Sequence, residues 1–272
     1  MPELPEVETS TRGIKPHIQG QYLSRMVMRR DNLRWAIPKD ELKSLEGERL
    51  LEVGRRGKYI VLRFTSGAML IHLGMSGNVR IVNAGADVSK HDHVDAEFTN
   101  GKALRLHDPR RFGCWLYTNE PIDEHTLIKK LGPEPLTDDF NLDYFWAQSR
   151  GKKQAVKTWV MDSHLVVGVG NIYACESLFL AKINPKAVVG RLSKKRLERL
   201  LHTIKHVLAA AIEQGGTSLK DFVGSDGKPG YFKQELNVYG RSGEACTVCG
   251  QSVKQITQGQ RSTFYCGECQ KN

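Results

Sequence analysis

The chain has 272 residues, enough for one large or two medium domains with a buried core. Its apolar runs fall short of the roughly 18 residues that cross a bilayer, so we expect no membrane partner. A surplus of 40 basic over 30 acidic residues gives a net charge of +10, which favours a polyanionic partner, although solvated surface lysines alone can produce it. The sequence carries no secretory leader pattern, and its cysteines are clustered as in reduced proteins, so we expect a cytoplasmic location.

The first predicted element is a short helix over residues 4–15. Pro5 suits the first helical turn, and acidic side chains such as Glu6 suit the positive end of a helix. Leu4 and Val7 share one face of this helix, and Pro16 marks its predicted end.

The residues before this helix could also form a reactive group. If Met1 is removed, Pro2 becomes a secondary amine with a pKa near the roughly 7.7–8.0 of α-amino groups, so much of it is unprotonated at neutral pH. Attack of such an amine on an aldehyde-level carbon gives a cationic iminium, and Glu3 lies beside it to shuttle protons. From these residues alone, the alternative that prolines and carboxylates only begin a helix stays open.

Short β-favouring runs follow, many of them alternating between apolar and polar residues and separated by turn signals. This pattern is typical of an antiparallel sandwich or barrel. The runs cover residues 22–30, 49–56, 58–65, 68–74, 78–82, 93–99, 102–107 and 114–118.

Two motifs among these runs are candidates for contact with nucleic acid. The sequence DPRRFG places Arg110 and Phe112 on a loop between strands, where they could enter a base stack; the alternative is a turn with a core Phe and surface arginines. His91 and His93 resemble a metal-binding pair, but alternate strand residues rarely chelate without a third ligand. Structural or phosphate-contacting roles are therefore favoured for these histidines.

After LGPEPLTDD at residues 131–139 the pattern becomes helical, and we place a domain boundary there. Helices are predicted over 143–150, 171–181 and 196–214, the last with Ser193 as N-cap and Gly215-Gly216 as its stop. A Gly-x-Gly-Asn turn opens the helix at Asn171, which fits either a phosphate site or a tight structural turn. The predicted domains are residues 1–131, 132–235 and 236–272.

The last segment has the spacing of a four-cysteine zinc ribbon. Cys246 and Cys249 form one Cys-x2-Cys pair, and Cys266 and Cys269 form a second pair, with sixteen residues between the two pairs. Four thiolates complete a closed tetrahedron, so the zinc is expected to be structural; two disulfides or iron–sulfur ligation are the alternatives. The intervening residues alternate like a β-hairpin with Arg261 near its tip, where spacing alone favours a solvated surface charge.

Taken together, these motifs resemble bacterial formamidopyrimidine-DNA glycosylases over nearly the whole chain. The resemblance is carried by MPELPEVET, GRRGKYIVL, HLGMSG, KHDHVD, DPRRFG, LGPEPL, VVGVGNIYACESLF, QGGTSLKDF, SDGKPGYF and the four-cysteine segment, in the order of the family. It implies an α+β fold with an N-terminal antiparallel β-sandwich, a helix–two-turn–helix domain and a zinc ribbon.

The resemblance also implies a function. Members of the family excise oxidised purines, such as 8-oxoguanine and formamidopyrimidines, through an N-terminal proline iminium and then cleave the strand by β,δ-elimination. The implied partner is double-stranded DNA containing oxidised purines, bound by a monomer. One structural Zn²⁺ is expected, with no catalytic metal and no redox cofactor.

Site residues are carried over position by position. Pro2 matches the nucleophile, Glu3 the catalytic acid, and Lys58 and Arg261 the residues that grip phosphate and assist the eliminations. The remaining matches are Met75, Arg110 and Phe112 for the wedge that fills the gap left by a flipped nucleotide, His91, Lys152 and Asn171 for the DNA backbone, and Glu6, Lys157, Lys220 and the 217–230 loop for the flipped base.

Departures from the family pattern are few and avoid the catalytic positions. Thr158 stands where a proline is common, and Cys175 where a small residue is usual. The nearest alternative is an endonuclease VIII type glycosylase for oxidised pyrimidines, whose start usually reads PEGPE where this chain reads PELPE. A non-catalytic DNA-binding protein is the second alternative, and the presence of Pro2, Glu3 and Lys58 argues against it.

Overall fold

The structure is a computed structural model that describes residues 2–215 and 236–271. The described residues divide into two compact units. The first contains residues 2–130 together with 214–215, and the second contains residues 131–213 together with 236–271. The boundary between the units after residue 130 lies where the sequence changes from strand-like to helical patterns. The separate third domain that we predicted from residue 236 stays a prediction.

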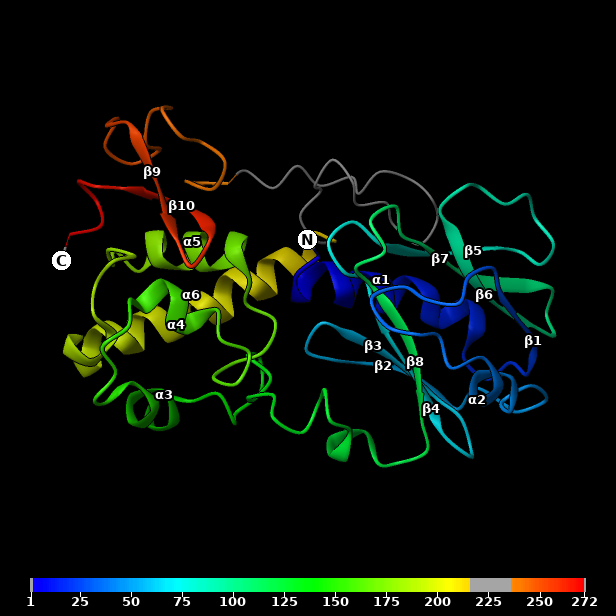
Figure 1. The fold of residues 1–272 in the computed structure, drawn as a ribbon. Helices are drawn as coiled ribbons and strands as arrows, with labels where there is room; N and C mark the ends of the chain where they lie inside the picture. The colour runs from blue at the N-terminus through cyan, green and yellow to red at the C-terminus, as the bar shows by residue number, and fades with distance from the viewer. Residues whose placement is uncertain (1, 216–235, 272) are drawn as a thin grey trace. The chain divides into compact units, whose positions relative to one another are not determined.

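The first unit is a β-sandwich of two four-stranded antiparallel sheets, which confirms the predicted fold class (Figure 1). Apolar side chains from both sheets, such as Leu62, Ile71, Val94 and Leu104, share one buried core. One sheet has the order β1-β6-β7-β5 and the other β2-β3-β4-β8. The strands are β1 (Leu23–Met28), β2 (Glu52–Arg56), β3 (Tyr59–Arg63), β4 (Ala68–His72), β5 (Asn78–Asn83), β6 (Asp92–Phe98), β7 (Lys102–His107) and β8 (Cys114–Thr118).

Helix α1 (Leu4–Ile18) contacts β2 and β3 of one sheet and β5 and β7 of the other. The predicted end at Pro16 is wrong, because the helix continues through this proline to Ile18. Proline removes one backbone donor and crowds the preceding turn. However, Ile14 and Ile18 lie one turn apart and are both completely buried, and this burial keeps the last turn helical.

Four short helical segments were not foreseen in the sequence. They are α2 (Lys39–Lys43), α4 (Val156–Val160) and the 3-10 turns η1 (Ile122–Glu124) and η2 (Val189–Arg191). A segment of one turn contains too few residues to display a helical period, so the pattern that reveals longer helices is missing.

The second unit is helical and ends in a β-hairpin. Helix α5 contacts α4, α6 and strand β10, and α3 also packs on α6, so α5 lies at the centre of the unit. At the start of α6 the Arg196 N–H donates to Ser193 Oγ at 3.3 Å, which confirms the predicted N-cap. The longer helices are α3 (Leu142–Ser149), α5 (Asn171–Leu180) and α6 (Lys194–Glu213), and the hairpin is formed by β9 (Val253–Gln258) and β10 (Arg261–Cys266).

Candidate active site and DNA-contacting elements

Pro2 and Glu3 are buried at the start of α1. Glu3 is the N-cap residue and is 1% exposed. Its backbone N–H donates to Glu6 Oε2 at 2.8 Å, and Glu6 completes a capping box with Glu3. Glu6 is completely buried, so its carboxylate fixes the backbone of the residue that follows Pro2. The chain end is therefore held in place.

An ion pair connects α1 to the turn that carries Lys58. Arg55 Nε donates to Glu8 Oε2 at 2.8 Å, and Arg55 Nη1 donates to the carbonyl of Gly57 at 2.8 Å. Burial alone would raise the pKa of Glu8, but hydrogen bonds from Arg55 and Arg12 outweigh it and hold that pKa below its usual range. Lys58 follows Gly57 directly in the β2–β3 turn, so this pair fixes the lysine's backbone relative to α1.

His72 belongs to the same region, and the sequence did not single it out. It lies opposite Tyr59 on β3 and opposite Cys114 on β8. Burial, helped by the positive charges of Lys58 and Arg34, lowers the pKa of His72 to about 4. The ring is therefore neutral at pH 7, and Nδ1 accepts the N–H of Gly74 at 3.0 Å.

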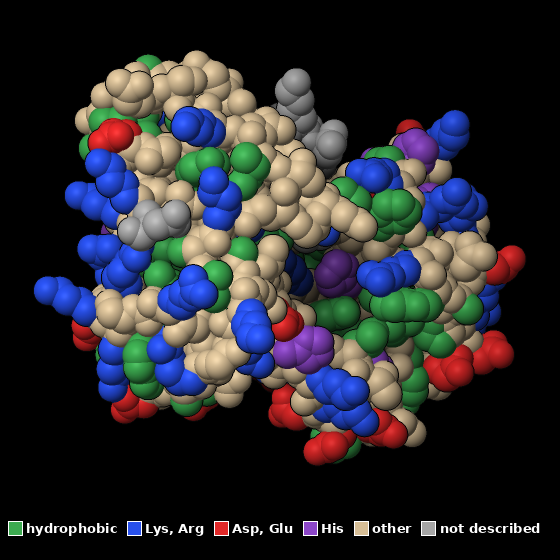
Figure 2. Space-filling view, turned by 60° about the vertical axis from the view of Figure 1, so that its left-hand side comes forward, with side chains coloured by type: hydrophobic (Ala, Val, Ile, Leu, Met, Phe, Trp, Pro, Cys, Tyr) green, Lys and Arg blue, Asp and Glu red, His purple; other side chains and the backbone are tan. Residues whose placement is uncertain are grey.

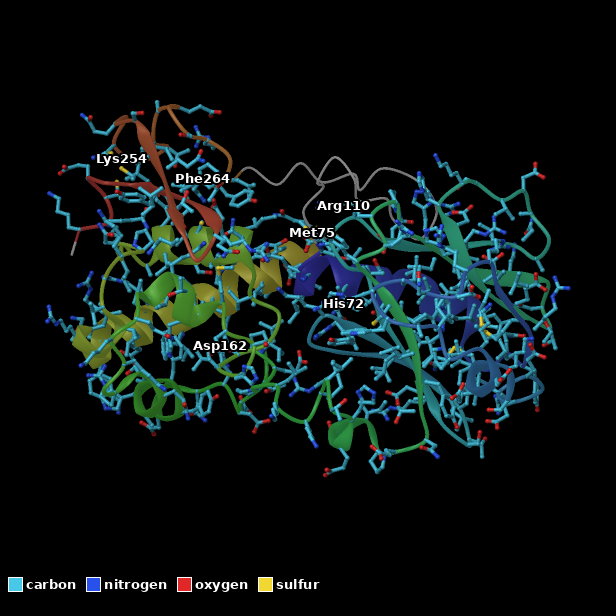
Figure 3. All side chains as sticks on the ribbon, viewed as in Figure 1. His72, Met75, Arg110, Asp162, Lys254 and Phe264 are labelled. Carbon is cyan, nitrogen blue, oxygen red and sulfur yellow. The ribbon has the colours of Figure 1, made fainter. Side chains whose placement is uncertain are left out.

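The three predicted wedge residues lie on two loops that pack against each other. Met75 follows β4, and Arg110 lies between β7 and β8 (Figure 3). Phe112 lies on the same loop as Arg110. A Cβ atom placed on Gly74 would lie 2.5 Å from the carbonyl carbon of Phe112, so the two loops touch through their backbones. The Arg110 guanidinium carbon is 4.9 Å from the centre of the Phe112 ring. Phe112 is 47% exposed, which rules out the alternative of a core phenylalanine.

The histidines at 91 and 93 do not form a metal site. His93 is 2% exposed, and its Nε2 lies 2.9 Å from the carbonyl oxygen of Asp108. Asp92, between the two histidines, accepts from Arg80 at 2.8 Å instead. Among the described residues, the only group with metal-binding spacing is the four cysteines. His93 is therefore structural, while His91 is half-buried.

In the second unit, one side chain connects two predicted site elements. Asn171 at the start of α5 accepts from Lys157 Nζ at 2.5 Å and donates to the carbonyl of Ser262 at 2.8 Å. Lys157 lies on α4 and is completely buried. The structure thus brings Lys157 and Asn171 together beside the strand that begins with Arg261.

The remaining predicted positions after residue 130 are exposed or lie outside the described residues. Arg261 is exposed and follows Gln260, which has a φ of 59° at the tip of the β9–β10 hairpin, as predicted. Lys152 is exposed in the turn after α3, and its carbonyl accepts from Gly190 N–H at 3.1 Å. Lys220 and the loop 217–230 lie outside the described residues.

The four cysteines fit one tetrahedral zinc ion. All four Sγ atoms lie within 4.8 Å of one another, with 3.9 Å between Cys246 and Cys269 and 3.4 Å between Cys249 and Cys266. Zinc–sulfur bonds of about 2.3 Å in a tetrahedron place sulfur atoms about 3.8 Å apart. Four thiolates would fill all four coordination positions of the zinc, so these residues would hold a structural ion.

A buried carboxylate holds the segment that leads into this zinc module. Glu176 on α5 is 3% exposed and accepts from the backbone N–H groups of Asn237, Val238 and Tyr239, each at 2.9 Å. Sequence patterns did not reveal this contact, because a glutamate inside an apolar helix gives no sign of a partner 61 residues away.

Comparison with known proteins decides the family. Three family models match in order: a formamidopyrimidine-DNA glycosylase N-terminal domain at residues 1–115, its H2TH domain at 131–223, and a zinc finger found in FPG and IleRS at 243–272. The chain is 53% identical to the formamidopyrimidine-DNA glycosylase of Idiomarina loihiensis and 54% identical to that of Saccharophagus degradans, covering 100% of each pair of chains. The chain belongs to the formamidopyrimidine-DNA glycosylase family.

Solved structures of the formamidopyrimidine-DNA glycosylase family have the same fold. The protein from Thermus thermophilus is 36% identical with a TM-score of 0.89, covering 99% of this chain and 98% of that chain. Wild-type Lactococcus lactis Fpg in complex with DNA containing N7-benzyl-Fapy-dG is 34% identical with a TM-score of 0.90, covering 100% of both chains. The α+β fold and the zinc finger predicted from the sequence are thereby confirmed.

The matched family models also show in which domain each of these residues lies. The N-terminal domain contains Pro2, Glu3 and Lys58, and the zinc finger contains Arg261 and the four cysteines. Thr158 and Cys175, the departures from the family pattern, both have structural surroundings. Thr158 donates to the carbonyl of Ala155 at 2.9 Å, and Cys175 packs in a small core with residues of the zinc module. Within the described residues, no helix has the length and apolar character needed to span a membrane.

Proposed function

We propose that this protein is a bifunctional DNA repair glycosylase that excises oxidised purines and then cleaves the DNA strand. The observation that carries the proposal is the buried and capped chain start, in which Glu6 fixes Glu3 beside Pro2. Removal of Met1 would turn the buried Pro2 into a secondary amine, a nucleophile that a simple helix start does not require. The relatives named formamidopyrimidine-DNA glycosylase support the same activity.

The proposed chemistry begins once Met1 has been removed. The Pro2 amine attacks C1′ of the damaged nucleoside, the base leaves, and the iminium that forms acidifies the protons on C2′. Glu3 lies next to this amine and moves protons, first to the sugar ring oxygen. Loss of the 3′ phosphate and then of the 5′ phosphate leaves a one-nucleoside gap. Lys58 and Arg261 bind phosphate and assist these eliminations.

The damaged base cannot react while it is stacked in the duplex, so it must be extruded. Met75, Arg110 and Phe112 are proposed to fill the space that it leaves, because they lie on two loops in backbone contact and Phe112 is exposed. His91, Lys152 and Asn171 are proposed to contact the DNA backbone. The basic charge of the chain, +10, supports a polyanionic partner.

Base recognition is proposed for Glu6, Lys157 and Lys220. The buried position of Lys157 against Asn171 supports a contact that forms only with a flipped nucleotide, not with exposed phosphate. The zinc ion held by the four cysteines would stabilise the hairpin that carries Arg261 and take no part in the chemistry. We further propose that the protein works as a monomer in the bacterial cytoplasm, on nucleoid DNA.

Borohydride trapping tests the proposal. The protein is incubated with a duplex containing 8-oxoguanine in the presence of borohydride, and the reduced cross-link is mapped by mass spectrometry. The expected cross-link is on Pro2. A cross-link on a lysine, or none with protein lacking Met1, would contradict the mechanism. Placing one alanine before Pro2 should abolish trapping and leave binding to the lesion duplex measurable.

An oxidised pyrimidine is the second candidate substrate. One solved relative is a complex of wild-type Lactococcus lactis Fpg with DNA containing an oxidised pyrimidine; it is 33% identical with a TM-score of 0.90. A competition between duplexes that contain 8-oxoguanine and an oxidised pyrimidine ranks the two. Faster excision of the pyrimidine would move the proposal to the endonuclease VIII type.

A further inference from the structure

The two loops that carry the proposed wedge are held together by one buried residue, Asp108, to which no role has been assigned so far. Asp108 is completely buried, although it precedes three exposed residues, Pro109, Arg110 and Arg111. A buried carboxylate is costly unless its oxygens are hydrogen-bonded, and among the described residues only Oδ2 of Asp108 has a partner. Its contacts therefore indicate what it stabilises.

The side chain of Asp108 closes its own loop. Asp108 Oδ2 accepts the N–H of Gly113 at 2.8 Å, and the Asp108 carbonyl accepts the N–H of Arg111 at 3.3 Å. The bond to Arg111 closes a turn around Arg110, and the bond to Gly113 closes a wider loop that also includes Phe112. Arg111 has a φ of 59°, an uncommon backbone conformation for a residue with a side chain, so the closed loop compensates for local strain.

The backbone of Asp108 connects this loop to the strand pair behind it. Its N–H donates to the carbonyl of His91 at 3.0 Å, and its carbonyl lies 2.9 Å from Nε2 of the buried His93. Burial lowers the pKa of His93 below its usual range, so the ring is neutral at pH 7 and donates through Nε2–H. Asp108 thus fixes the backbone of His91, a proposed phosphate contact, together with the wedge loop.

The closed loop in turn supports the loop that carries Met75. A Cβ atom on Gly113 would lie 2.5 Å from the carbonyl oxygen of His72, and one on Gly74 would lie 2.5 Å from the nitrogen of Gly113. The loops approach this closely only because both positions are glycine, and Gly74 also has a φ of 65°. A shift of the Gly113 amide would therefore displace residues 72–75.

We propose that Asp108 is a positioning residue that preassembles Met75, Arg110 and Phe112 as one rigid wedge. It does so before DNA binds, because all of its bonds are present in the free protein. Preassembly avoids the entropy loss of ordering these side chains during base extrusion. This inference rests on the proposed function, since it assigns the three residues to a gap in the duplex.

The test separates wedge insertion from the chemistry of Pro2. Excision is measured on a duplex containing 8-oxoguanine, and insertion is followed by the fluorescence of 2-aminopurine placed next to the lesion. Trapping by borohydride on a single-stranded abasic oligonucleotide reports the Pro2 chemistry, because no base has to be extruded there. If the wild-type protein fails to excise 8-oxoguanine, the proposed function fails and the inference falls with it.

Asp108→Ala is expected to slow duplex excision about tenfold or more and to abolish most of the 2-aminopurine signal, because it leaves the Gly113 N–H without its buried acceptor. Trapping on the single strand should stay within about twofold of wild type, since the contacts of Pro2 are unchanged. Asp108→Asn retains an acceptor of the same shape and should restore excision. Asp123→Ala, at an exposed aspartate of the same unit, is the matched control.

Two results would overturn the inference. One is a folded Asp108→Ala variant with wild-type excision and fluorescence; the other is an equal loss in the duplex and single-strand assays, which indicates general damage. If thermal unfolding shows that Asp108→Ala does not fold, Asp108→Ser carries the test by the same criteria, because its shorter side chain keeps a hydroxyl in the loop but draws the acceptor back from the Gly113 N–H.

Discussion

Glu3 and Glu6 are two buried carboxylates that cap each other's backbone at the start of α1. Glu6 accepts the backbone N–H of Glu3 at 2.8 Å and so satisfies a helix donor that would otherwise be orphaned. The Glu3 side chain accepts the backbone N–H of Glu6 in return, and Glu3 follows Pro2 directly in the chain. The prediction that Glu6 recognises the lesion remains a prediction, but its capping contact already explains why a carboxylate is buried there.

His72 gives a pH-dependent prediction at the residue scale. Its pKa falls from 6.5 to about 4 in the folded protein, so between these values the unfolded chain takes up a proton that the folded protein refuses. Folding stability should therefore decrease as the pH falls from 6.5 towards 4, and it should not depend on this residue above 6.5. His72→Asn, which can accept from Gly74 N–H but cannot titrate, should remove this component.

The measurement is urea unfolding of wild type and His72→Asn from pH 4 to pH 7.5. The difference between their unfolding free energies should change in favour of the variant below pH 6.5 and be constant above it. His17→Asn, at an exposed histidine of the same unit, is the control and should follow wild type. A constant difference over the whole range would show that His72 keeps an ordinary pKa.

At the scale of elements, the zinc module depends on packing as well as on metal. Phe264 and Cys266 of β10 and Val253 of β9 share a small core with Phe179 of α5. The hairpin that carries Arg261 is therefore held by packing against α5 and by the four cysteines that would bind zinc. Loss of the ion would remove one of these two supports.

Cys249→Ala is expected to abolish zinc binding and to loosen this hairpin, because three thiolates leave the tetrahedron open. Affinity for a lesion duplex should fall about tenfold or more, while trapping at Pro2 on a single-stranded abasic oligonucleotide should persist. Elemental analysis and fluorescence anisotropy are the measurements. Val248→Ala, at an exposed neighbour between the two cysteines, should retain one zinc per chain; a zinc-free Cys249→Ala protein with full affinity would contradict this role.

Sequence patterns predicted the elements whose signal is local. The eight strands show alternation and turn residues, and α6 shows a helical period with the Ser193 cap, so both were found. The pattern misled at Pro16, where burial of Ile18 outweighs the proline. It was silent on Asp108 and Glu176, because their partners are set by the tertiary fold and not by sequence spacing.

For the candidate site, the cysteine spacing was informative by itself, whereas Pro2 and Arg261 were not. Local chemistry left both with ordinary structural alternatives. Only their occurrence in a full set of ordered motifs assigned them, which is information about the whole chain. The positions of Lys58 and His72 relative to each other come from a strand register that no local pattern specifies.

At the scale of the whole molecule, the positive charge is shared between residues 1–130 and the rest of the chain. Residues 1–130 contain 21 lysines and arginines against 17 acidic residues, and residues 131–272 contain 19 against 13. Figure 2 shows lysine and arginine side chains spread over much of the visible face. Both parts of the chain therefore favour a polyanion, which supports the proposed DNA contacts in each of them.

Lys152 and Lys153 test this view as a matched pair. Both are exposed in the same turn, but only Lys152 is a proposed phosphate contact. Its backbone is fixed by the Gly190 N–H, which donates to the Lys152 carbonyl at 3.1 Å, so truncating the side chain should leave the turn intact. Each phosphate contact releases counterions, and the logarithm of the binding constant therefore falls with the logarithm of salt concentration by about 0.9 per contact.

Lys152→Ala should reduce the magnitude of that salt slope by about one and weaken binding to lesion-containing and undamaged duplexes alike, because phosphate contacts carry no base information. Lys153→Ala should leave the slope at its wild-type value. Fluorescence anisotropy over a series of potassium chloride concentrations measures both. Equal slopes for the two variants would remove Lys152 from the DNA interface, and a loss confined to the lesion duplex would instead place it near the flipped base.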